Sequence, residues 1–492
     1  MPKENTITAA ALQEDLTAQA AQLDARPATF APELQALLDA YTPIDFRAKA
    51  EASGLAPTEN LTQKIELVVA VREILRQTEA QGAGLAFSAG SYYIYSTGYW
   101  RELDRLTLQA FLTAAGIALG LKPNHAQHFE TQDALRKQFE ATALQLDPQR
   151  APGLVLINFE NGTLEIEGNR LKLRPPRRAD FLKYQLPYSY DPAASCPQFK
   201  RYLNRVLPDE TAQAVLSEFV GNTLAPSLNL QKVLILQGSG CNGKSVFCDI
   251  VTALLGRENV TSYTIASLTK EDSRSRFRLA NALLNYSGEN SIKMNAEAFK
   301  TLAAGEAIEA RRLYGDSFIM EHYARLMFNC NILPRDIEQS EGFFRRFLII
   351  PFNAKITEAE KDPQLAAKIT AAELPGIFNW ILEGLQRLLQ ARRYTDCEAA
   401  RLELENYKKE SNSVLCFLED CNITPGADEK QKESLQRLYS CYRAYCLDNG
   451  HRYPVARRQL AKTLRDNGYR EAPRQAAGVY FYCNYNQASI DY

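Results

Sequence analysis

Hydrophobic and polar positions change their period several times along the chain, and each change predicts a different kind of element. Leucines and alanines recur at helical spacing over 12–23 and again over 65–75, which predicts amphipathic helices. Proline ends or kinks a helix, and four prolines interrupt this pattern: Pro27, Pro32, Pro43 and Pro57. We expect residues 1–80 to be a helical, partly extended cap, with an adapter or oligomerisation role as the alternative.

Aromatic and polar residues alternate from residue 82 onward, around Gly90 and Gly98. A period of two predicts short antiparallel strands joined by tight turns. Their aromatic rings either form the core of a small sheet or stack on nucleic-acid bases, and we favour the core. Helical spacing returns over 105–146.

A hairpin pattern covers 154–176, with turns expected at Asn161-Gly162 and Gly168-Asn169. We expect the basic cluster that follows to be a solvated run of charges, with contact to a phosphate backbone as the alternative; its members are Arg174, Arg177, Arg178 and Lys183. Prolines between 187 and 197 predict a linker, and residues 198–224 have the pattern of two helices.

Continuous apolar runs in the second half of the chain predict buried strands. They cover 233–236, 282–287, 326–331 and 347–351, and longer segments separate them. Buried apolar strands joined by helices are typical of a parallel α/β sheet. The first of these strands leads into a glycine-rich stretch, 238–245, and an amphipathic helix follows.

Residues 238–245 fit the P-loop pattern GxxxxGK[ST], after a strand and before a helix as this motif requires. Glycines let the backbone turn its N–H groups toward a polyphosphate, and the helix N-terminus adds unpaired donors. We expect Lys244 to reach the β- and γ-phosphates and Ser245 to ligate Mg²⁺. The predicted nucleotide-binding residues are Gly238, Ser239, Gly240, Cys241, Asn242, Gly243, Lys244, Ser245 and Val246.

Polar residues stand at the ends of the other apolar strands. Glu289 follows the second strand, where a carboxylate can hold the Mg²⁺ shell or polarise the attacking water. Asn331 ends the third strand, where its amide would hydrogen-bond the γ-phosphate or that water. Arg345 and Arg346 precede the fourth strand. Burying arginines is costly unless they meet an anion, so one of them is a candidate arginine finger toward a neighbouring subunit.

Residues 300–316 lie between the second and third of these strands, and their pattern predicts a helix followed by a hairpin that turns at Gly315-Asp316. The hairpin is basic and aromatic, which suits a nucleic-acid backbone, with a solvated face as the alternative. The candidate DNA contacts are Lys300, Arg311, Arg312 and Tyr314.

The C-terminal stretch is locally basic. Between 435 and 475, nine residues are Lys or Arg and three are Asp or Glu. Two helical patterns separated by glycine turns and followed by strand-like 479–482 predict a winged helix that binds duplex or forked DNA. A helical protein–protein module is the alternative. The candidate DNA contacts on one helix are Arg457, Arg458, Lys462 and Arg465.

Composition narrows the class of protein. The chain has 492 residues and a net charge of −1, so any nucleic-acid surface must be local. No apolar run has membrane-spanning length and the N-terminus has no signal-peptide core, from which we expect a soluble, cytoplasmic protein without a membrane partner. Two CxxxxC pairs indicate core packing, with zinc as the alternative: Cys416, Cys421, Cys441 and Cys446.

The order of these motifs resembles that of superfamily 3 helicases, in particular the phage and plasmid primase–helicase branch that includes the poxvirus-type proteins. The resemblance extends upstream to Tyr99-Trp100, 157–162 and 186–192, so it covers 85–490. It implies an AAA+-like core, a hexameric ring with ATP and Mg²⁺ at its subunit interfaces, and translocation along single-stranded DNA.

The resemblance also implies roles. Lys244 and Ser245 match the Walker A pair, Glu289 the Walker B carboxylate and Asn331 the sensor. Arg346 ranks before Arg345 as the finger, and the DNA-facing motif matches Lys300, Arg311 and Arg312. Asn290 departs from the pattern because many relatives carry a second acid there. We therefore expect Glu289 to act alone and turnover to be slow.

These observations predict an α/β protein with four regions: helical 1–80, a small α+β domain at 81–197, an AAA+-like P-loop ATPase with flanking helices at 198–410, and a winged helix at 411–492. The predicted function is an ATP-dependent DNA helicase of a phage, plasmid or integrated mobile element, acting on single-stranded and forked DNA. The first 85 residues are too short for a primase domain, so any primase would be a separate partner. The alternatives are an ATP-regulated origin-binding initiator and an ATPase switch in a defence system.

Overall fold

The computed structural model describes residues 30–151, 153–271, 273–289, 294–311, 317–331, 333, 337–338, 340–426, 431–451, 454–473 and 478–484. The chain divides into two compact units: residues 1–151 with 175–185, and residues 152–174 with 186–492. No helix in the described part of the chain is long and apolar enough to cross a membrane.

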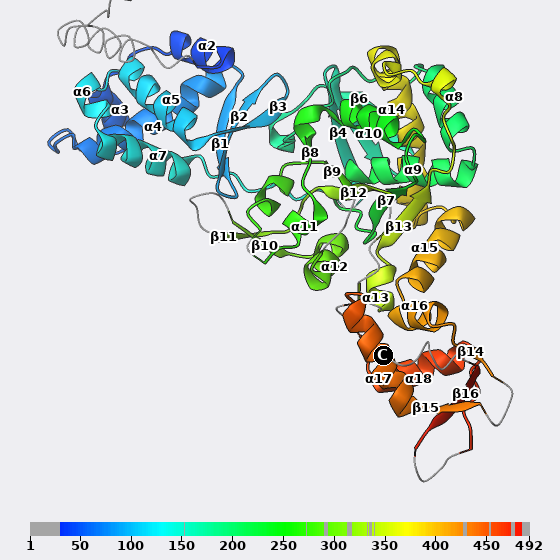
Figure 1. Ribbon diagram of the computed structural model, residues 1–492. Coiled ribbons are helices and arrows are strands. Elements are labelled where there is room, and N and C mark those ends of the chain that lie inside the picture. Colours follow the sequence, from blue (N-terminus) through cyan, green and yellow to red (C-terminus); the bar gives the residue numbers. More distant parts are fainter. Residues whose placement is uncertain are drawn as a thin grey trace, which may run out of the picture. The chain divides into compact units, whose positions relative to one another are not determined.

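The first unit combines helices with a small antiparallel sheet (Figure 1). Its helices are α2 (Pro32–Ala40), α3 (Phe46–Ala52), α4 (Gln63–Ala80), α5 (Arg105–Leu119), α6 (Pro123–Ala126) and α7 (Phe129–Thr142). Its strands are β1 (Gly84–Ser88), β2 (Ser91–Ser96) and β3 (Tyr99–Leu103), in the order β1-β2-β3. A short 3₁₀ turn, η1 (Arg178–Asp180), completes it.

One hydrophobic core spans the boundary predicted between residues 80 and 81. Leu37 of α2 and Ile74 of α4 share this core with Ile94 of β2 and Phe111 of α5. An amphipathic helix is stable in a domain only when its apolar face is covered. The structure therefore differs from the predicted division: residues 30–80 form one unit with the strands and helices that follow them.

The aromatic residues of this sheet serve the core. Tyr92, Tyr93 and Trp100 are buried, and Trp100 Nε1 donates a hydrogen bond to the Arg178 carbonyl at 3.0 Å. This agrees with the interpretation that we favoured over base stacking. Three cations of the basic cluster are ion-paired within their own units: Arg174 with Glu165, Arg178 with Glu79 at 3.1 Å, and Lys183 with Asp147 at 3.2 Å.

The second unit opens with the antiparallel strands β4 (Leu154–Phe159), β5 (Gly162–Glu167) and β6 (Arg170–Arg174). The turn between β5 and β6 is at Gly168-Asn169, as predicted, whereas the turn between β4 and β5 is at Glu160-Asn161, one residue before the predicted position. The segment predicted as a linker packs against the long helix α14 (Leu365–Ala391). Asn379 Nδ2 donates to the carbonyls of Asp191 and Ala194 in this segment at 2.9 Å each. Phe159 of β4 packs on the same helix, with its ring centroid 4.7 Å from that of Phe378. Residues 152–174 and 186–197 therefore belong with the second unit, whereas we predicted them in the domain at 81–197.

A five-stranded parallel sheet forms the centre of the second unit, in the order β13-β7-β12-β9-β8. Its strands are β7 (Val233–Gln237), β8 (Val260–Thr261), β9 (Leu284–Glu289), β12 (Arg325–Cys330) and β13 (Phe347–Pro351). All four predicted apolar strands are present. In the register, Cys330 of β12 lies beside Gln237 of β7 and Glu289 of β9, so three strands end at one edge.

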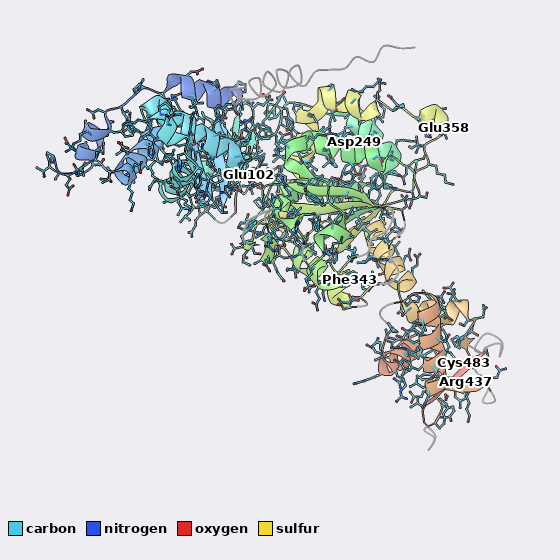
Figure 2. All side chains as sticks on the ribbon, turned by 60° about the vertical axis from the view of Figure 1, so that its left-hand side comes forward. Glu102, Asp249, Phe343, Glu358, Arg437 and Cys483 are labelled. Carbon is cyan, nitrogen blue, oxygen red and sulfur yellow. The ribbon has the colours of Figure 1, made fainter. Side chains whose placement is uncertain are left out.

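Helices pack around this sheet (Figure 1). They are α8 (Pro197–Val206), α9 (Glu210–Thr223), α10 (Lys244–Leu255), α11 (Ile265–Leu268), α12 (Ala296–Ala304), α13 (Glu341–Phe344), α14 and α15 (Glu398–Glu410), with the 3₁₀ turns η2 (Arg257–Asn259), η3 (Arg276–Leu279) and η4 (Glu358–Glu360). The helices α9 and α14 approach closely at Gly384 of α14, because a Cβ there would lie 2.4 Å from Ser217 Oγ of α9. Phe343, labelled in Figure 2, packs on Phe299 and Phe347 with ring centroids 5.2 and 5.1 Å apart.

The C-terminal part of the second unit has its own core. It contains α16 (Ser413–Asp420), α17 (Leu435–Asp448) and α18 (Arg457–Asp466), with a sheet of β14 (Thr424–Pro425), β16 (Tyr480–Asn484) and β15 (Lys432–Ser434) in that order. Phe417, Tyr442 and Phe481 are fully buried there. Cys421, Cys441 and Cys446 belong to the same core, as core packing predicts, and Cys416 packs at its margin.

Candidate functional site

The glycine-rich loop begins at the carboxyl end of β7, between two neighbouring strands. The Gly238 amide donates to the Cys330 carbonyl of β12 at 3.2 Å, and the Phe352 amide after β13 donates to the Gln237 carbonyl at 2.8 Å. A Cβ on Gly238 would lie 2.1 Å from Asn242 Nδ2 and 2.6 Å from the Phe352 carbonyl oxygen. The close approach of these groups therefore requires glycine at this position.

The loop itself takes a strained path before α10. Gly240 and Gly243 have φ of +101° and +88°, and Cys241 adopts a left-handed conformation with φ of +48°. The Cys241 carbonyl accepts a hydrogen bond from the Ile356 amide at 3.0 Å, and the Gly243 carbonyl accepts one from Tyr202 Oη at 2.8 Å. Two segments distant in sequence thus hold the loop in place.

Lys244 is the buried cation of this loop. Its side chain donates from Nζ to the Gly238 carbonyl at 2.6 Å and to Asn242 Oδ1 at 3.2 Å. Burial lowers the pKa of its ammonium group. Both acceptors are neutral, and the residue is only 4% exposed. A buried ammonium group with uncharged partners is favourable only where an anion completes its surroundings.

A hollow of about 490 Å³ lies in front of the loop. Residues 240–246 line one side, and Gly288 of β9 lines another. Asn329 and Asn331 line it from β12 and the position just after it. The structure therefore brings the predicted loop and the predicted Asn331 together at the carboxyl edge of the sheet, where α/β proteins bind ligands.

Asn329 also lines this hollow, although it is not among the site residues predicted from the sequence. Its Oδ1 is buried, without a hydrogen-bond partner among the residues that the structure describes. Side chains two apart on a strand point to the same face, so Asn329 and Asn331 face the hollow together. The signal was present in the sequence, since an asparagine interrupts the apolar run 326–330.

Glu289 is the last residue of β9, and the structure describes its backbone alone. Its register partner is Cys330, one residue before Asn331. The backbone thus places Glu289 at the same edge as the loop. Asn290, the position that departs from the resembled family, lies outside the described residues.

Arg346 is oriented differently from our prediction. Its side chain is buried, its Nε donates to the Lys300 carbonyl at 3.0 Å, and the Gly342 carbonyl also accepts from it. Its own carbonyl accepts from the Val233 amide, at the amino end of β7. Five strand residues separate that end from the loop, a length of about 15 Å. Arg345 is exposed, so it replaces Arg346 as the arginine available to a neighbouring molecule.

The predicted DNA-contact hairpin is partly described. Strands β10 (Ile308–Arg311) and β11 (Ser317–Met320) pair antiparallel, and Arg311 is exposed at the end of β10. Lys300 of α12 is instead ion-paired with Glu338 at 2.9 Å. Arg312 and Tyr314 lie outside the described residues. Of the two predicted contacts that the structure describes, Arg311 is therefore the more accessible.

The cations of α18 are on its exposed side. Arg457, Arg458 and Lys462 are exposed, whereas Leu460 and Leu464 are buried in the C-terminal core. Arg465 is also exposed, but its guanidinium is ion-paired with Glu471 at 2.6 Å. Three of the four predicted cations thus point outward without an ion pair in the part of the chain that the structure describes.

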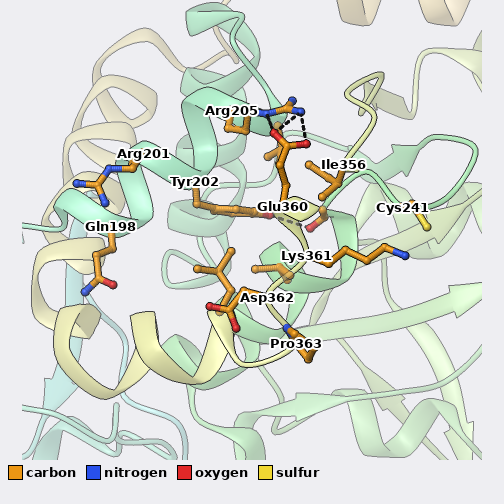
Figure 3. Close-up of a pocket in the computed structure, with 14 residues that line it drawn as sticks. Gln198, Arg201, Tyr202, Arg205, Cys241, Ile356, Glu360, Lys361, Asp362 and Pro363 are labelled. Atoms are coloured by element: carbon orange, nitrogen blue, oxygen red, sulfur yellow. Dashed lines mark hydrogen bonds and ion pairs between the residues drawn. The ribbon is translucent and has the colours of Figure 1, made fainter. Parts of the chain in front are cut away.

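A second hollow, of about 410 Å³, adjoins the loop from the other side (Figure 3). It shares Cys241, Gly243 and Val246 with the first hollow. Tyr202 and Val206 of α8 line it together with Ile356, Leu365 and several charged residues. Figure 3 shows Arg205 bonded to Glu360 across its rim, with Nε 3.0 Å from Oε1. The sequence does not reveal this hollow, because its walls come from segments about 150 residues apart.

Two stretches of the chain match known protein families. Residues 81–208 match the family described as "D5 N terminal like", and residues 236–346 match the "Family of unknown function (DUF5906)". "Putative helicase L207/L206" of Acanthamoeba polyphaga mimivirus is 24% identical over 46% of this chain. "Putative helicase 121R" of Invertebrate iridescent virus 3 is 22% identical over 49% of it. The chain spans only 24% and 27% of the length of these two relatives.

Among solved structures, the C-terminal region of NrS-1 in its apo A form has a TM-score of 0.44 and 14% identity. That match covers 80% of this chain and 85% of the other. The family model at 81–208 and the two viral relatives support a relation to D5-like primase–helicases. They suggest a replication role of the helicase or primase type.

Proposed function

We propose that the protein is an ATP-driven DNA helicase with an AAA+-like P-loop core of the superfamily 3 type. The observation that carries this proposal is Lys244: a buried cation with two neutral partners, under a glycine-rich loop at the carboxyl edge of a parallel sheet. Such a site suits a polyphosphate, because backbone donors and the helix N-terminus add to the charge of the lysine. The relation to viral helicases supports the same conclusion.

The two hollows would bind different parts of the nucleotide. The polyphosphate would lie in the hollow with Lys244, Asn329 and Asn331. Asn329 Oδ1, which has no hydrogen-bond partner among the described residues, would accept a hydrogen bond from the attacking water, and the Asn331 amide would orient the γ-phosphate or that water. The nucleoside would lie in the hollow of Tyr202 and Ile356, because both hollows meet at the loop. Its volume and its mixed apolar and polar walls are those of a small-molecule pocket.

Mg²⁺ fits the oxygen donors available at this edge. The exposed Ser245 hydroxyl in the first turn of α10 and the Glu289 carboxylate would hold it, since Mg²⁺ prefers oxygen ligands and shares them with phosphates. When bound, the ion would neutralise charge on the transferring phosphoryl group. The protein's own contribution is to fix the phosphates with Lys244 and to position water with Glu289.

Glu289→Gln tests this assignment. We expect ATP binding within about twofold of wild type and hydrolysis slower by roughly 10²-fold, because the amide cannot polarise the attacking water. Binding is measured with a fluorescent ATP analogue and turnover by phosphate release. Asp249→Asn, which alters an exposed carboxylate on α10, is the matched control. Wild-type turnover by Glu289→Gln would remove Glu289 from the reaction.

Ile356→Ala tests the position of the base. We expect roughly tenfold weaker ATP binding, because apolar contact with the base is lost, and unchanged binding of inorganic tripolyphosphate, which has no base. Isothermal titration measures both ligands. Leu402→Ala removes an exposed leucine of α15 and serves as the control. An equal loss for both ligands would mean that Ile356 supports the loop rather than the base.

A second candidate function is an origin-binding initiator whose assembly ATP controls. The exposed cations of α18 favour it, because a basic helix in a winged-helix domain can enter the major groove of duplex DNA. Strand displacement on a forked substrate, beside footprinting on candidate origin DNA, separates the two functions. Unwinding without a footprint favours the helicase, and a footprint without unwinding favours the initiator. ATP turnover with neither would favour an ATPase switch.

A further inference from the structure

The outer face of β16 carries two tyrosines that the C-terminal core does not use. β16 is the middle strand of its sheet, and its residues alternate between the two faces. Phe481 and Cys483 are fully buried in the core. Tyr480 and Tyr482 lie on the opposite face and are half-buried. Their hydroxyls have no hydrogen bond to any residue that the structure describes.

A cation lies over each of these rings. Lys432 of β15 is the register partner of Tyr482, and its Nζ lies 5.8 Å from the centroid of the Tyr480 ring. On the other side of β16, the Arg470 carbonyl accepts from the Tyr482 amide at 2.9 Å, and the Arg470 guanidinium lies 5.8 Å from the Tyr482 ring. We call this set the tyrosine face: Lys432, Arg470, Tyr480 and Tyr482.

The tyrosine face is positive. Two neighbouring cations have carboxylate partners: Arg437 pairs with Glu433 at 3.3 Å, and Arg465 with Glu471. Glu433 pairs in register with Phe481 and so belongs to the core face. Lys432 and Arg470 have no carboxylate partner within the described residues. Their charge is therefore available to an anion beside the rings.

Rings flanked by cations suit a strand of nucleic acid whose bases are unpaired. Aromatic side chains stack on bases of any sequence, and neighbouring cations bind the backbone phosphates. Tyr480 and Tyr482 are two positions apart, a distance of about 6.6 Å along a strand. Successive bases in a duplex are about 3.4 Å apart and already stacked on each other. The spacing of these two strand positions is therefore wider than that of stacked bases in a duplex and suits an extended single strand.

We propose that the tyrosine face binds single-stranded nucleic acid, with Tyr480 and Tyr482 stacking on two bases and Lys432 and Arg470 contacting the adjoining phosphates. This site is separate from the ATP site and from the cations proposed for duplex DNA on α18. Through this site the C-terminal region would bind an unpaired strand independently of nucleotide turnover.

The test compares two probes on the full-length protein without ATP: a fluorescent oligothymidine and an abasic strand of the same length. In the Tyr480→Ala/Tyr482→Ala variant we expect at least about tenfold weaker binding of oligothymidine, because stacking is lost, and binding of the abasic strand within about twofold of wild type. Tyr480→Phe/Tyr482→Phe keeps both rings and should bind like wild type. Lys432→Ala/Arg470→Ala should weaken both probes and reduce the salt dependence of binding by roughly one to two phosphate contacts.

Tyr439→Ala, which removes a half-buried tyrosine from α17, controls for loss of stability and should leave both affinities unchanged. A wild-type experiment avoids variants: photocrosslinking to a strand with 5-iododeoxyuridine should label the peptide that contains Tyr480 and Tyr482. Equal losses on the two probes, or crosslinks confined to other peptides, would overturn the proposal. A duplex hairpin tests α18 separately. Arg457→Ala/Arg458→Ala should weaken binding of this hairpin, whereas Tyr480→Ala/Tyr482→Ala should not. All of these results are expected even if the proposed ATP site is wrong, because the binding measurements contain no ATP.

Discussion

Lys244→Ala is expected to reduce ATP hydrolysis by at least roughly 10³-fold, because the phosphates lose the one buried cation of the loop. Both ATP and inorganic tripolyphosphate should bind much more weakly, since Lys244 contacts phosphates that the two ligands share. Isothermal titration and phosphate release measure these effects.

The control for Lys244→Ala is Lys355→Ala, which removes an exposed lysine beyond β13. It should leave both ligands and turnover unchanged. Circular dichroism shows whether Lys244→Ala keeps its fold, which we expect because Lys244 forms no ion pair within the described residues. Normal turnover by a folded Lys244→Ala protein would contradict the nucleotide site and the proposed function with it.

Arg345→Ala is expected to bind ATP normally and to hydrolyse it roughly 10³-fold more slowly, if Arg345 completes the site of a neighbouring subunit. The Arg345 side chain is exposed. The strand that follows it, β13, begins at the amino edge of the sheet, opposite the glycine-rich loop of the same chain. Mixing Arg345→Ala with Lys244→Ala should restore partial activity, because a mixed ring places an intact Lys244 against an intact Arg345. Native mass spectrometry shows whether the rings are mixed.

Arg346→Ala is the matched comparison, and we expect a different effect from it. Its guanidinium bonds to the carbonyls of Lys300 and Gly342 in its own chain, so its loss should lower thermal stability. A mixture of Arg346→Ala and Lys244→Ala should have no more activity than the folded Arg346→Ala protein has by itself. Recovery with Arg346→Ala and none with Arg345→Ala would return the role to Arg346, as the resemblance first implied.

The fold of the second unit was largely predictable because its signals are local. An apolar run followed by Gly238–Ser245 and an amphipathic helix defines a strand, a loop and a helix within about 25 residues. The signals for the hairpin turns are similarly local, and they place one turn at Gly168-Asn169 and the other within one residue of its position at Glu160-Asn161. Strand ends could be predicted as well, and parallel pairing then brings Glu289 and Asn331 to one edge.

Tertiary structure decided which side chains are available at that edge and beyond it. Arg346 and Lys300 have the residue types expected of a finger and a DNA contact, but each is held by a group in its own chain, a carbonyl and Glu338 respectively. The hollow of Tyr202 and Ile356 exists only because α8 packs beside the segment after β13. Neighbouring residues determine a helix or a strand, whereas the partner of a charged side chain and the wall of a pocket come from contacts distant in sequence. The sequence therefore determined the loop, the strands and the edge where they meet, and the tertiary structure determined which charges remain free to act there.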